Sequence, residues 1–419
     1  MSVEFEKVRI GDLGKVVTGK TPPTAREEYF GADYPFITPT DIDGSKRHVE
    51  TERYLSQESK KDFSNYLLPS GAICFVCIGA TIGKICMTNV PSFTNQQINS
   101  IIVDGNRYDN CFIYYLLSTK KEHIKNIAGG AATPIVSKSA FSDVFVEIPE
   151  LIVQKKITAI LSAYDDLIEN NLRRIKISEE MAQTLYREWF VHFRFPGHQK
   201  VKMVNSPLGK IPEGWEIRQI DEVIETLGGG TPSTKEPSYW EGGNINWYSP
   251  SDLTASGSMF ITGSSKKITQ LGLDKSSAKL FPAYSLMMTS RATIGVISIN
   301  TEKACTNQGF ITCIPNDRLS VFHLYFWIKE NREKIISVAS GATFKEISRG
   351  EFREFPIVVT PLLIENTFVE TVEPIRRLIE NLIKRKYNLV VTRDLLLPKL
   401  ISGELDVSEL DITIPEANA

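Results

Sequence analysis

Apolar residues recur at alternating steps of three and four positions in two long stretches of the chain. This heptad spacing, sustained over about four to five repeats, predicts two amphipathic helices of about 38 residues, each roughly 57 Å long. Neither apolar seam is stable in water, so we expect the two helices to pack against each other. The residues expected in this helix-pair seam are Ile157, Leu161, Ile168, Leu185, Val372, Ile379, Leu382 and Leu389.

Polar residues interrupt the apolar seam at Asn171 and Lys386. In a paired-helix arrangement, such residues fix the register of the two helices at some cost in stability. The alternative interpretation is that the two stretches form unrelated surface helices.

The rest of the chain carries short apolar runs that are typical of β-strands. Runs such as AICFVCIG and GVISIN are bounded by Gly, Pro, Asn and Asp, the residues that punctuate strands. Two helical stretches, residues 109–128 and 320–339, interrupt these runs. The pattern therefore predicts globular α+β segments with irregular sheets.

The strand-rich pattern occurs twice. GKTPPTAREEYFGADYPFITPTDI at 19–42 returns as GGTPSTKEPSYWEGGNINWYSPSDL at 229–253. The short motifs ATIG, TNQ and LIEN also return, and AAT at 131–133 pairs with GAT at 341–343, at an offset of about 210 to 213 residues. This period is too long for a solenoid repeat and indicates a duplicated domain with its following helix.

Together these patterns predict an α+β fold with two duplicated globular domains. Two long antiparallel coiled-coil helices separate the domains, which a pseudo-twofold axis relates. Such a molecule would hold two binding surfaces at a fixed separation. The predicted segments are a first globular domain at 1–150, a first long helix at 151–195, a second globular domain at 205–360, a second long helix at 361–403 and an acidic tail at 404–419.

The composition is that of a folded soluble protein, with 42% apolar residues, 23% charged residues and a net charge of −2. No apolar run reaches the roughly 18 residues that a membrane span requires. The N-terminus, MSVEFEKVRIGD, carries acidic residues where a signal peptide has a basic start and an apolar stretch. We therefore expect a cytoplasmic protein, in which any contact with nucleic acid comes from local basic patches or from partners.

The stretch GKVVTGKT, residues 14–21, has the spacing of a phosphate-binding P-loop. A P-loop needs a helix that begins just after its lysine, but Pro22 and Pro23 follow here. The second copy also has Gly230 in place of Lys20. We expect a Gly-Thr-Pro loop after a strand, with a P-loop NTPase as the less favoured alternative.

Other motifs for catalysis or metal binding do not occur in the sequence. Cys74 and Cys77 form a C-x-x-C, but no second pair of Cys or His has the spacing of a zinc site, so we expect buried strand residues. The chain has no H-E-x-x-H, no G-x-S-x-G, no G-x-G-x-x-G after a strand and no methyl-transfer tetrapeptide. These absences predict a chain without catalytic or metal-binding residues.

The duplicated plan, with two globular domains alternating with two long helices, resembles the DNA-specificity (S) subunit of type I restriction–modification systems. The resemblance covers essentially the whole chain and rests on the order and double occurrence of several segments. These segments are GKTPPT at 19–24, LYREWFVHFRFPG at 185–197, GKIPEGWE at 209–216, GTPST at 230–234 and LLLPKLISGEL at 395–405.

The resemblance implies that each globular domain is a target-recognition domain that reads one half of a bipartite target in double-stranded DNA. It implies that the helices set the spacer, bounded by their length at about 17 base pairs, and dock two methyltransferase (modification) subunits. Restriction/translocase subunits then join the complex. The chain itself would be no enzyme and would hold no cofactor, because S-adenosylmethionine, ATP and Mg²⁺ are expected in the partner subunits.

Base readout requires amide and guanidinium groups, and phosphate contacts require Lys, Arg, Ser or Thr. The repeated Asn-Gln pairs can as well brace the fold, because repeated residues cannot explain two different half-sites. We therefore expect base readers where the copies differ, such as 43–53 against 254–267, with Lys46 and Arg47 on phosphates. The candidate DNA-binding residues are Lys20, Thr21, Thr24, Lys46, Arg47, Lys84, Gln96, Gln97, Thr231, Thr234, Lys235, Lys266, Lys267, Arg291, Gln308, Lys345 and Arg349.

Other functions stay open at this point. A duplicated-domain scaffold would show no DNA preference in any assembly. A P-loop NTPase would hydrolyse ATP alone and would lose that activity with Lys20→Ala. A recognition subunit that works only in modification, or whose partners are lost, would share this sequence.

Overall fold

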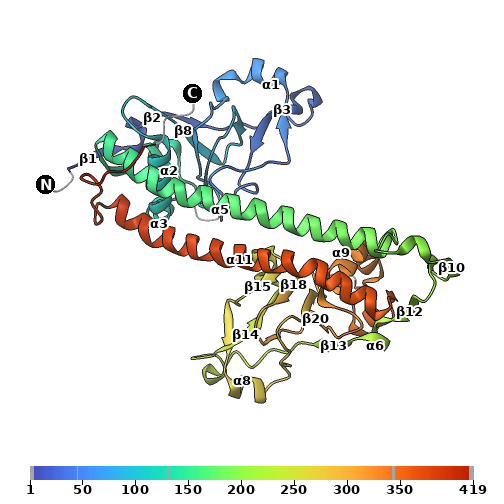
Figure 1. The fold of residues 1–419 in the computed structure, drawn as a ribbon. Helices are drawn as coiled ribbons and strands as arrows, with labels where there is room; N and C mark the ends of the chain where they lie inside the picture. Colours follow the sequence, from blue (N-terminus) through green and yellow to red (C-terminus); the bar gives the residue numbers. More distant parts are fainter. Residues whose placement is uncertain (1–3, 45, 130–132, 342–344, 415–419) are drawn as a thin grey trace. The chain divides into compact units, whose positions relative to one another are not determined.

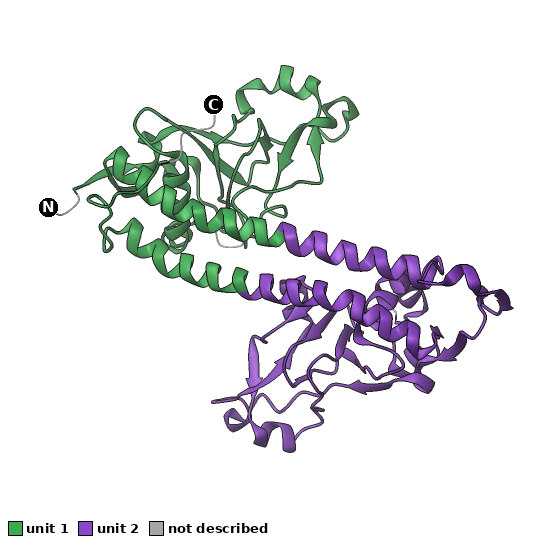
Figure 2. Cartoon of the chain, in the orientation of Figure 1, with its two compact units in different colours: residues 1–172, 385–419 green, residues 173–384 purple. Residues whose placement is uncertain are grey.

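The structure is a computed structural model that describes residues 4–44, 46–129, 133–341 and 345–414. The chain divides into two compact units: unit 1 comprises residues 1–172 and 385–419, and unit 2 comprises residues 173–384 (Figure 2). Each unit therefore contains one globular part and about half of each long helix. The repeated AAT and GAT triplets lie mostly outside the described residues.

The two stretches with heptad spacing form long helices. Helix α5 spans Leu151–Tyr186, 36 residues, and a π-helical turn follows at Arg187–Val191. Helix α11 spans Leu362–Ile401, 40 residues (Figure 1). It begins directly after Pro361, a residue favoured at helix starts because its missing N–H needs no partner there.

The predicted seam lies on the buried faces of these helices. In unit 1, Ile157 and Leu161 of α5 belong to one apolar core with Leu400 of α11. In unit 2, Trp189 after α5 contacts Phe368 of α11, with ring centroids 5.6 Å apart. The start of α5 thus meets the end of α11 in unit 1, and the reverse holds in unit 2. Within each unit the helix halves run antiparallel.

The other predicted seam residues differ in their burial. Ile168, Val372, Ile379 and Leu382 are buried, whereas Leu185 and Leu389 are only half-buried. Tyr186 is buried beside Leu185, where the regular helix ends and the π-helical turn begins. The last buried residue of α5 is therefore Tyr186, one position later than the strict heptad predicts.

The described residues in the globular part of unit 1 form three sheets. They are a ribbon of β1 and β9, a four-stranded sheet in the order β2-β8-β5-β6, and a three-stranded sheet in the order β4-β3-β7. The strands are β1 (Phe5–Arg9), β2 (Gly14–Thr18), β3 (Phe30–Ile37), β4 (Tyr54–Leu55), β5 (Ile73–Val76), β6 (Ile85–Met87), β7 (Phe93–Thr94), β8 (Ile98–Val103) and β9 (Phe145–Pro149). The shorter helices are α1 (Gln57–Asp62), α2 (Asn110–Thr119), α3 (Lys121–Asn126) and α4 (Lys138–Ser142).

Unit 2 repeats this topology. The ribbon β12–β21 corresponds to β1–β9, the sheet β13-β20-β17-β18-β15 to the four-stranded sheet, and β16-β14-β19 to β4-β3-β7, with a hairpin β10–β11 in addition. The strands are β10 (Met203–Ser206), β11 (Gly209–Pro212), β12 (Glu216–Gln219), β13 (Glu225–Gly228), β14 (Ile245–Tyr248), β15 (Phe260–Ile261), β16 (Lys266–Ile268), β17 (Leu286–Thr289), β18 (Ile297–Asn300), β19 (Ala304–Thr306), β20 (Phe310–Ile314) and β21 (Pro356–Val359). The shorter helices are α6 (Ile220–Val223), α7 (Pro250–Ser256), α8 (Gln270–Asp274), α9 (Val321–Val338) and α10 (Arg349–Arg353). The duplicated α+β fold predicted from the sequence is confirmed.

The run AICFVCIG is apolar throughout because its strand, β5, has a core on each side. Ile73 and Phe75 pack into the core that contains α2 and α5, whereas Cys74 and Val76 pack into a second core on the other face. Cys74 in β5 and Cys77 are buried, as the sequence predicted, although Cys77 lies directly after the strand rather than in it. Neither forms a disulfide. Burial raises the pKa of the Cys77 thiol to about 11, so this thiol is protonated at neutral pH.

The segments 185–197 and 209–216 pack together in unit 2. Trp215 lies against Phe190 and Phe195, at centroid distances of 5.9 and 5.2 Å, and meets Phe193 edge-on at 5.4 Å. This aromatic cluster fixes the chain where it leaves α5 and enters the second globular part. Large aromatic contacts of this kind explain why residues 185–197 are rich in aromatic side chains and why residues 209–216 contain a Trp.

Candidate nucleic-acid interface

The stretch GKVVTGKT ends in an irregular loop. Residues 14–18 form strand β2, and residues 19–26, all of which the structure describes, contain no helix. The amide of Lys20 donates to the carbonyl of Thr94 at 2.9 Å, and its ammonium lies over the rings of Phe63 and Tyr66. Without a helix N-terminus behind the lysine, the loop has no P-loop cradle for phosphate.

Backbone hydrogen bonds join this loop to four others in unit 1. The amide of Asn95 donates to Ile37 at 3.2 Å, the amide of Cys77 to Gln97 at 2.8 Å, and the amide of Val136 to Cys77 at 2.8 Å. Main-chain hydrogen bonds thus join all five loops. We call this group loop cluster 1; it consists of residues 19–24, 37–41, 77–84, 94–97, 129 and 133–136.

Unit 2 contains the same framework. The amide of Gly230 donates to Thr306 at 2.8 Å, the amide of Asn307 to Tyr248 at 3.0 Å, and the amide of Ser290 to Gly309 at 2.8 Å. Each bond occupies the position equivalent to one in unit 1. We call this group loop cluster 2; it consists of residues 229–234, 248–252, 290–295, 306–309, 340, 341 and 345–347.

One side-chain hydrogen bond also recurs in both clusters. The hydroxyl of Thr21 donates to the side-chain oxygen of Gln96 at 2.7 Å, and Thr231 donates to Gln308 at 2.6 Å. The repeated Gln therefore holds the Gly-Thr-Pro loop. This geometry favours the bracing role that the sequence left open for the Asn-Gln pair.

We expect Thr21→Val to loosen loop cluster 1 without unfolding unit 1. A hydrogen bond of this kind contributes about 0.5–1.5 kcal/mol, so amide exchange at residues 19–21 and 94–97 should accelerate roughly 2- to 10-fold. Hydrogen–deuterium exchange measures this. Thr24→Val is the matched control, because the described residues offer Thr24 no hydrogen-bond partner. Equal exchange in both variants would contradict the bracing role.

A second repeated motif closes the turn after β3 and β14. Asp41 accepts from the amide and the hydroxyl of Thr38, both at 2.7 Å, and Asp252 accepts from the same groups of Ser249 at 2.7 and 2.6 Å. Burial opposes ionisation of Asp252, but the donors from Ser249 and Ser265 outweigh it and lower the pKa of the carboxyl group. Both carboxylates thus accept hydrogen bonds within their own turns and stabilise them.

The candidate residues of unit 1 fall into two groups. Lys20, Thr24 and Gln96 are exposed on loop cluster 1, and Thr21 is half-buried beside Gln96. The other candidates turn inward. Lys84 donates to the carbonyl of Pro39 at 3.0 Å, the side-chain oxygen of Gln97 accepts from the side-chain amide of Asn95 at 3.0 Å, and Lys46 is half-buried.

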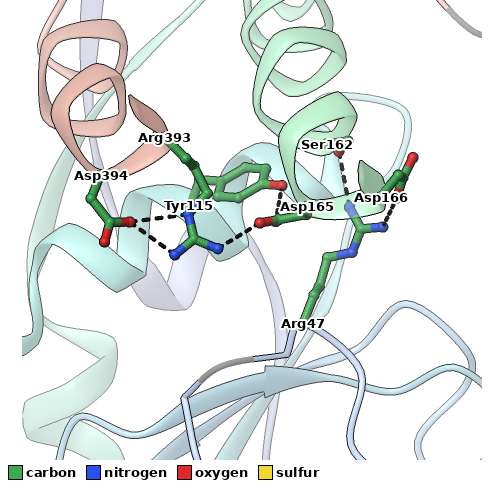
Figure 3. Close-up of polar contacts among 7 residues, drawn as sticks. All are labelled: Arg47, Tyr115, Ser162, Asp165, Asp166, Arg393 and Asp394. Carbon is green, nitrogen blue, oxygen red and sulfur yellow. Dashed lines mark hydrogen bonds and ion pairs between the residues drawn. The ribbon is translucent and has the colours of Figure 1, made fainter. Parts of the chain in front are cut away.

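Arg47 does not occupy the position that we expected. Its side chain is only 12% exposed and donates to Ser162 at 2.9 Å and to Asp166 at 3.2 Å on α5 (Figure 3). A guanidinium held by a helix is not free to contact a phosphate. Arg47 therefore anchors the globular part of unit 1 to α5, and we withdraw it from the predicted DNA-contacting residues.

A neighbouring network links the same helix to α11 in unit 1. Asp165 accepts a hydrogen bond from the hydroxyl of Tyr115 at 2.5 Å and another from Arg393 at 2.7 Å (Figure 3). Arg393 also pairs with Asp394 at 2.8 Å. The hydrogen bonds and charges of these groups are matched by one another inside unit 1. The network therefore stabilises the fold.

The candidates of unit 2 are more exposed. Thr231, Thr234, Lys235, Gln308 and Lys345 project from or beside loop cluster 2. The further exposed candidates are Lys266, Lys267, Arg291 and Arg349.

Two lysines of unit 2 flank a surface hollow. Lys266 lies 5.8 Å from the ring centroid of Trp240, and these two residues line a hollow of about 350 Å³ with Thr234 and Lys267. A lysine pair beside an aromatic face suits a sugar–phosphate strand, because the cations contact phosphate and the ring offers a stacking surface.

Sequence reasoning missed one arginine. Arg53 is exposed, its guanidinium lies over Phe36, and it donates to the hydroxyl of Thr38 in loop cluster 1 at 3.3 Å. The available signal was its position in segment 43–53, where the two copies differ. From that segment, only Lys46 and Arg47 are among the predicted DNA-contacting residues.

Two properties of the described residues bear on the kind of site. Within them, no three or more His, Cys, Asp or Glu side chains are grouped so that they could hold a metal ion. None of the helices that the structure describes combines the length and apolar character needed to cross a bilayer.

The sequence and the fold both match known proteins. The model of the type I restriction modification DNA specificity domain matches residues 2–178 and 212–390. The chain is 29% identical over 421 residues to the type I restriction enzyme MjaIX specificity subunit of Methanocaldococcus jannaschii, covering 97% of this chain and 95% of that protein. It is 34% identical over 183 residues to the HindI specificity subunit of Haemophilus influenzae, covering 42% and 39%.

The fold is similar to that of a solved protein. The crystal structure of the type I restriction-modification system S subunit from M. genitalium superposes with a TM-score of 0.59 at 16% identity. The match covers 95% of this chain and 96% of that one. At this identity the likeness concerns the fold alone.

Proposed function

The chain belongs to the type I restriction–modification DNA specificity family, and on this premise we propose that it binds a bipartite DNA target and directs methyltransferase and restriction subunits to it. The observation that carries the proposal is the repeated loop cluster. One backbone framework occurs once in each unit, and the two copies differ in their exposed side chains. Two similar but unequal surfaces suit a target with two different halves.

We assign one half-site to each unit. Loop cluster 2, with the lysine-lined hollow beside it, offers the stronger basic surface, whereas loop cluster 1 contributes Lys20, with Arg53 beside it. Exposed cations on and beside loop cluster 1 are few, and the net charge of the chain is −2. Both properties favour DNA binding by the assembled complex, in which partner subunits add positive charge.

The chemistry of modification and cleavage is proposed to reside in the partners. This chain would recognise DNA without catalysis, and S-adenosylmethionine, ATP and Mg²⁺ would bind to the methyltransferase and restriction subunits. Such a complex acts on DNA inside the cell, so we place the chain in the cytoplasm.

The outer face of α11 suits the docking of a partner subunit. Tyr387, Val391 and Leu395 are exposed large apolar residues at steps of four on this helix. Steps of four place side chains on one face, so the three form a continuous apolar stripe in unit 1. Exposed apolar stripes of this kind mark protein contacts more often than free surface.

The proposal is tested by sequencing methylated bases in the host genome, with and without this gene. We expect a split motif that carries methylated adenine in both halves and that disappears on deletion. Co-purification of the full chain with a methyltransferase subunit checks that the partner is present. A genome whose methylation is unchanged on deletion, although the partner co-purifies, would contradict the proposal.

Removing the two lysines of the hollow should weaken DNA binding and its dependence on salt. Each lost phosphate contact reduces the slope of log K against log salt by about 0.9, so the double substitution Lys266→Ala and Lys267→Ala should reduce it by about 2. The measurement is a titration of DNA into the complex of the full chain with its methyltransferase subunits. The control is Lys200→Ala with Lys202→Ala, two exposed lysines outside loop cluster 2. An unchanged slope would remove the hollow from the DNA surface.

A further inference from the structure

One corner of loop cluster 1 lies where the loop of residues 77–84 meets the loop that contains residues 129 and 133–136. Ile135 exchanges both backbone hydrogen bonds with Gly129, at 2.8 and 3.0 Å. The amide of Gly79 donates to Pro134 at 2.9 Å, which places Ile78 against Ile135. We call Ile78, Pro134 and Ile135 corner 1.

Loop cluster 2 has the same corner. Glu346 exchanges both backbone hydrogen bonds with Ser340, at 2.8 and 2.9 Å, and the amide of Ala292 donates to Lys345 at 3.2 Å. Arg291 and Glu346 bridge as Ile78 and Ile135 do. We call Arg291, Lys345 and Glu346 corner 2.

A strained backbone angle shows how closely the two corners agree. Gly79 has φ of +88°, a left-handed conformation that glycine adopts without cost. The equivalent residue of unit 2 is Ala292, and it keeps a left-handed φ of +57° despite its Cβ atom. The turn geometry is therefore retained even where the sequence disfavours it, so the side chains on either side occupy equivalent places.

The two corners nevertheless present opposite chemistry. Corner 1 carries only apolar side chains, and Ile135 is 45% exposed. Corner 2 carries only charged side chains, with Arg291 and Glu346 paired at 2.7 Å on the surface. Three equivalent positions thus change together from apolar to charged on one unchanged framework.

We propose that this corner determines base specificity in each half of the target, an inference that rests on the proposed function. Corner 1 selects an A·T pair, because an exposed aliphatic side chain contacts the thymine methyl group and offers no hydrogen bond to other base edges. Corner 2 selects a G·C pair, because the guanidinium of Arg291 donates to O6 and N7 of guanine while the carboxylate of Glu346 accepts from N4 of cytosine.

The Arg291–Glu346 ion pair in corner 2 can separate at small cost, so that each side chain contacts a base instead. An ion pair that is exposed to water is a weak contact, so Arg291 and Glu346 lose little when they separate to meet a base pair. The donor and the acceptor already lie side by side, as the groups on the two bases of a G·C pair do. A competing use of corner 2 is phosphate contact by Arg291 and Lys345, which would carry no sequence preference.

The test exchanges the chemistry of the corners in the full chain, expressed with its methyltransferase partner. Arg291→Ile with Glu346→Ile makes corner 2 aliphatic, and Ile78→Arg with Ile135→Glu makes corner 1 charged. Genome-wide sequencing of methylated bases gives the motif of each variant. The matched control is Arg218→Ile with Glu216→Ile, an exposed ion pair on β12 outside loop cluster 2.

We expect each exchange to change one position in one half of the motif and to leave the other half unchanged. A good bidentate contact discriminates by roughly 10-fold or more, so the aliphatic corner 2 should lose its G·C preference by at least about 10-fold. The control should keep the wild-type motif.

Every other result overturns the inference. If both exchange variants methylate the wild-type motif, the corner does not read bases. If an exchange variant abolishes methylation, the purified complex is titrated with DNA carrying each base pair at each motif position, and an unchanged preference order again contradicts the assignment. If the wild-type gene specifies no split motif, the proposed function itself fails, which is a distinct outcome.

Discussion

Replacing Asp165 by alanine is expected to destabilise unit 1 by about 3 kcal/mol, at the lower end of the range for breaking a buried ion pair. The side chain of Asp165 is 7% exposed and accepts hydrogen bonds from Tyr115 and Arg393. Its removal leaves a buried hydroxyl and a half-buried guanidinium with fewer partners, and both groups then bear an uncompensated desolvation cost. Urea unfolding, followed by amide exchange in unit 1, measures the loss.

Asp166→Ala is the matched control for this prediction. Asp166 is the next residue of α5, it also pairs with an arginine, and its side chain is 65% exposed. An exposed ion pair contributes at most about 1 kcal/mol, so the control should lose no more than that. Equal losses in the two variants would mean that the Tyr115–Asp165–Arg393 network contributes nothing beyond a surface contact.

Leu382→Asp is expected to prevent unit 2 from folding stably. Leu382 is 1% exposed and belongs to the core of unit 2, which also contains Ile175 of α5 and Phe368 of α11. An aspartate there loses the burial of a leucine and places a charge in an apolar core without a partner, a combination that costs more than about 4 kcal/mol. Proteolysis and circular dichroism of the purified chain report whether unit 2 remains folded.

Leu378→Asp is the control, because Leu378 lies one helical turn earlier on α11 and is 39% exposed. A charge at that position remains in contact with water, so we expect a change of less than about 1 kcal/mol. If Leu382→Asp assembled with its partners as well as the control does, the seam between α5 and α11 would not be required for the fold.

The features that repeat along the chain were predictable from the sequence. The heptad spacing indicated α5 and α11 because it is a local periodicity, and the similar segments at an offset of about 210 residues indicated the duplicated sheets because a repeat is visible in the sequence itself. The end of α5 was less predictable. A helix was expected to residue 195, but regular helix ends at Tyr186, and a π-helical turn follows.

The roles of single side chains depended on partners far away in the chain. Arg47 looked like an exposed cation in a variable loop, but its partner Ser162 lies 115 positions later. No local pattern reports such a contact. The bracing bond between Thr21 and Gln96 also joins residues 75 positions apart, although its recurrence in unit 2 gave a usable signal. Which candidates contact DNA stays a prediction.

The matched hydrogen bonds of the two loop clusters have a consequence for how such a protein diverges over generations. Peptide groups hold the loops in place, and every residue except proline supplies the same peptide groups whatever its side chain. Point mutations of exposed side chains in the loops therefore have little effect on the fold, because they leave these backbone hydrogen bonds intact. After the ancestral gene segment was duplicated, the two halves were free to drift toward separate preferences, each without endangering the fold of the other.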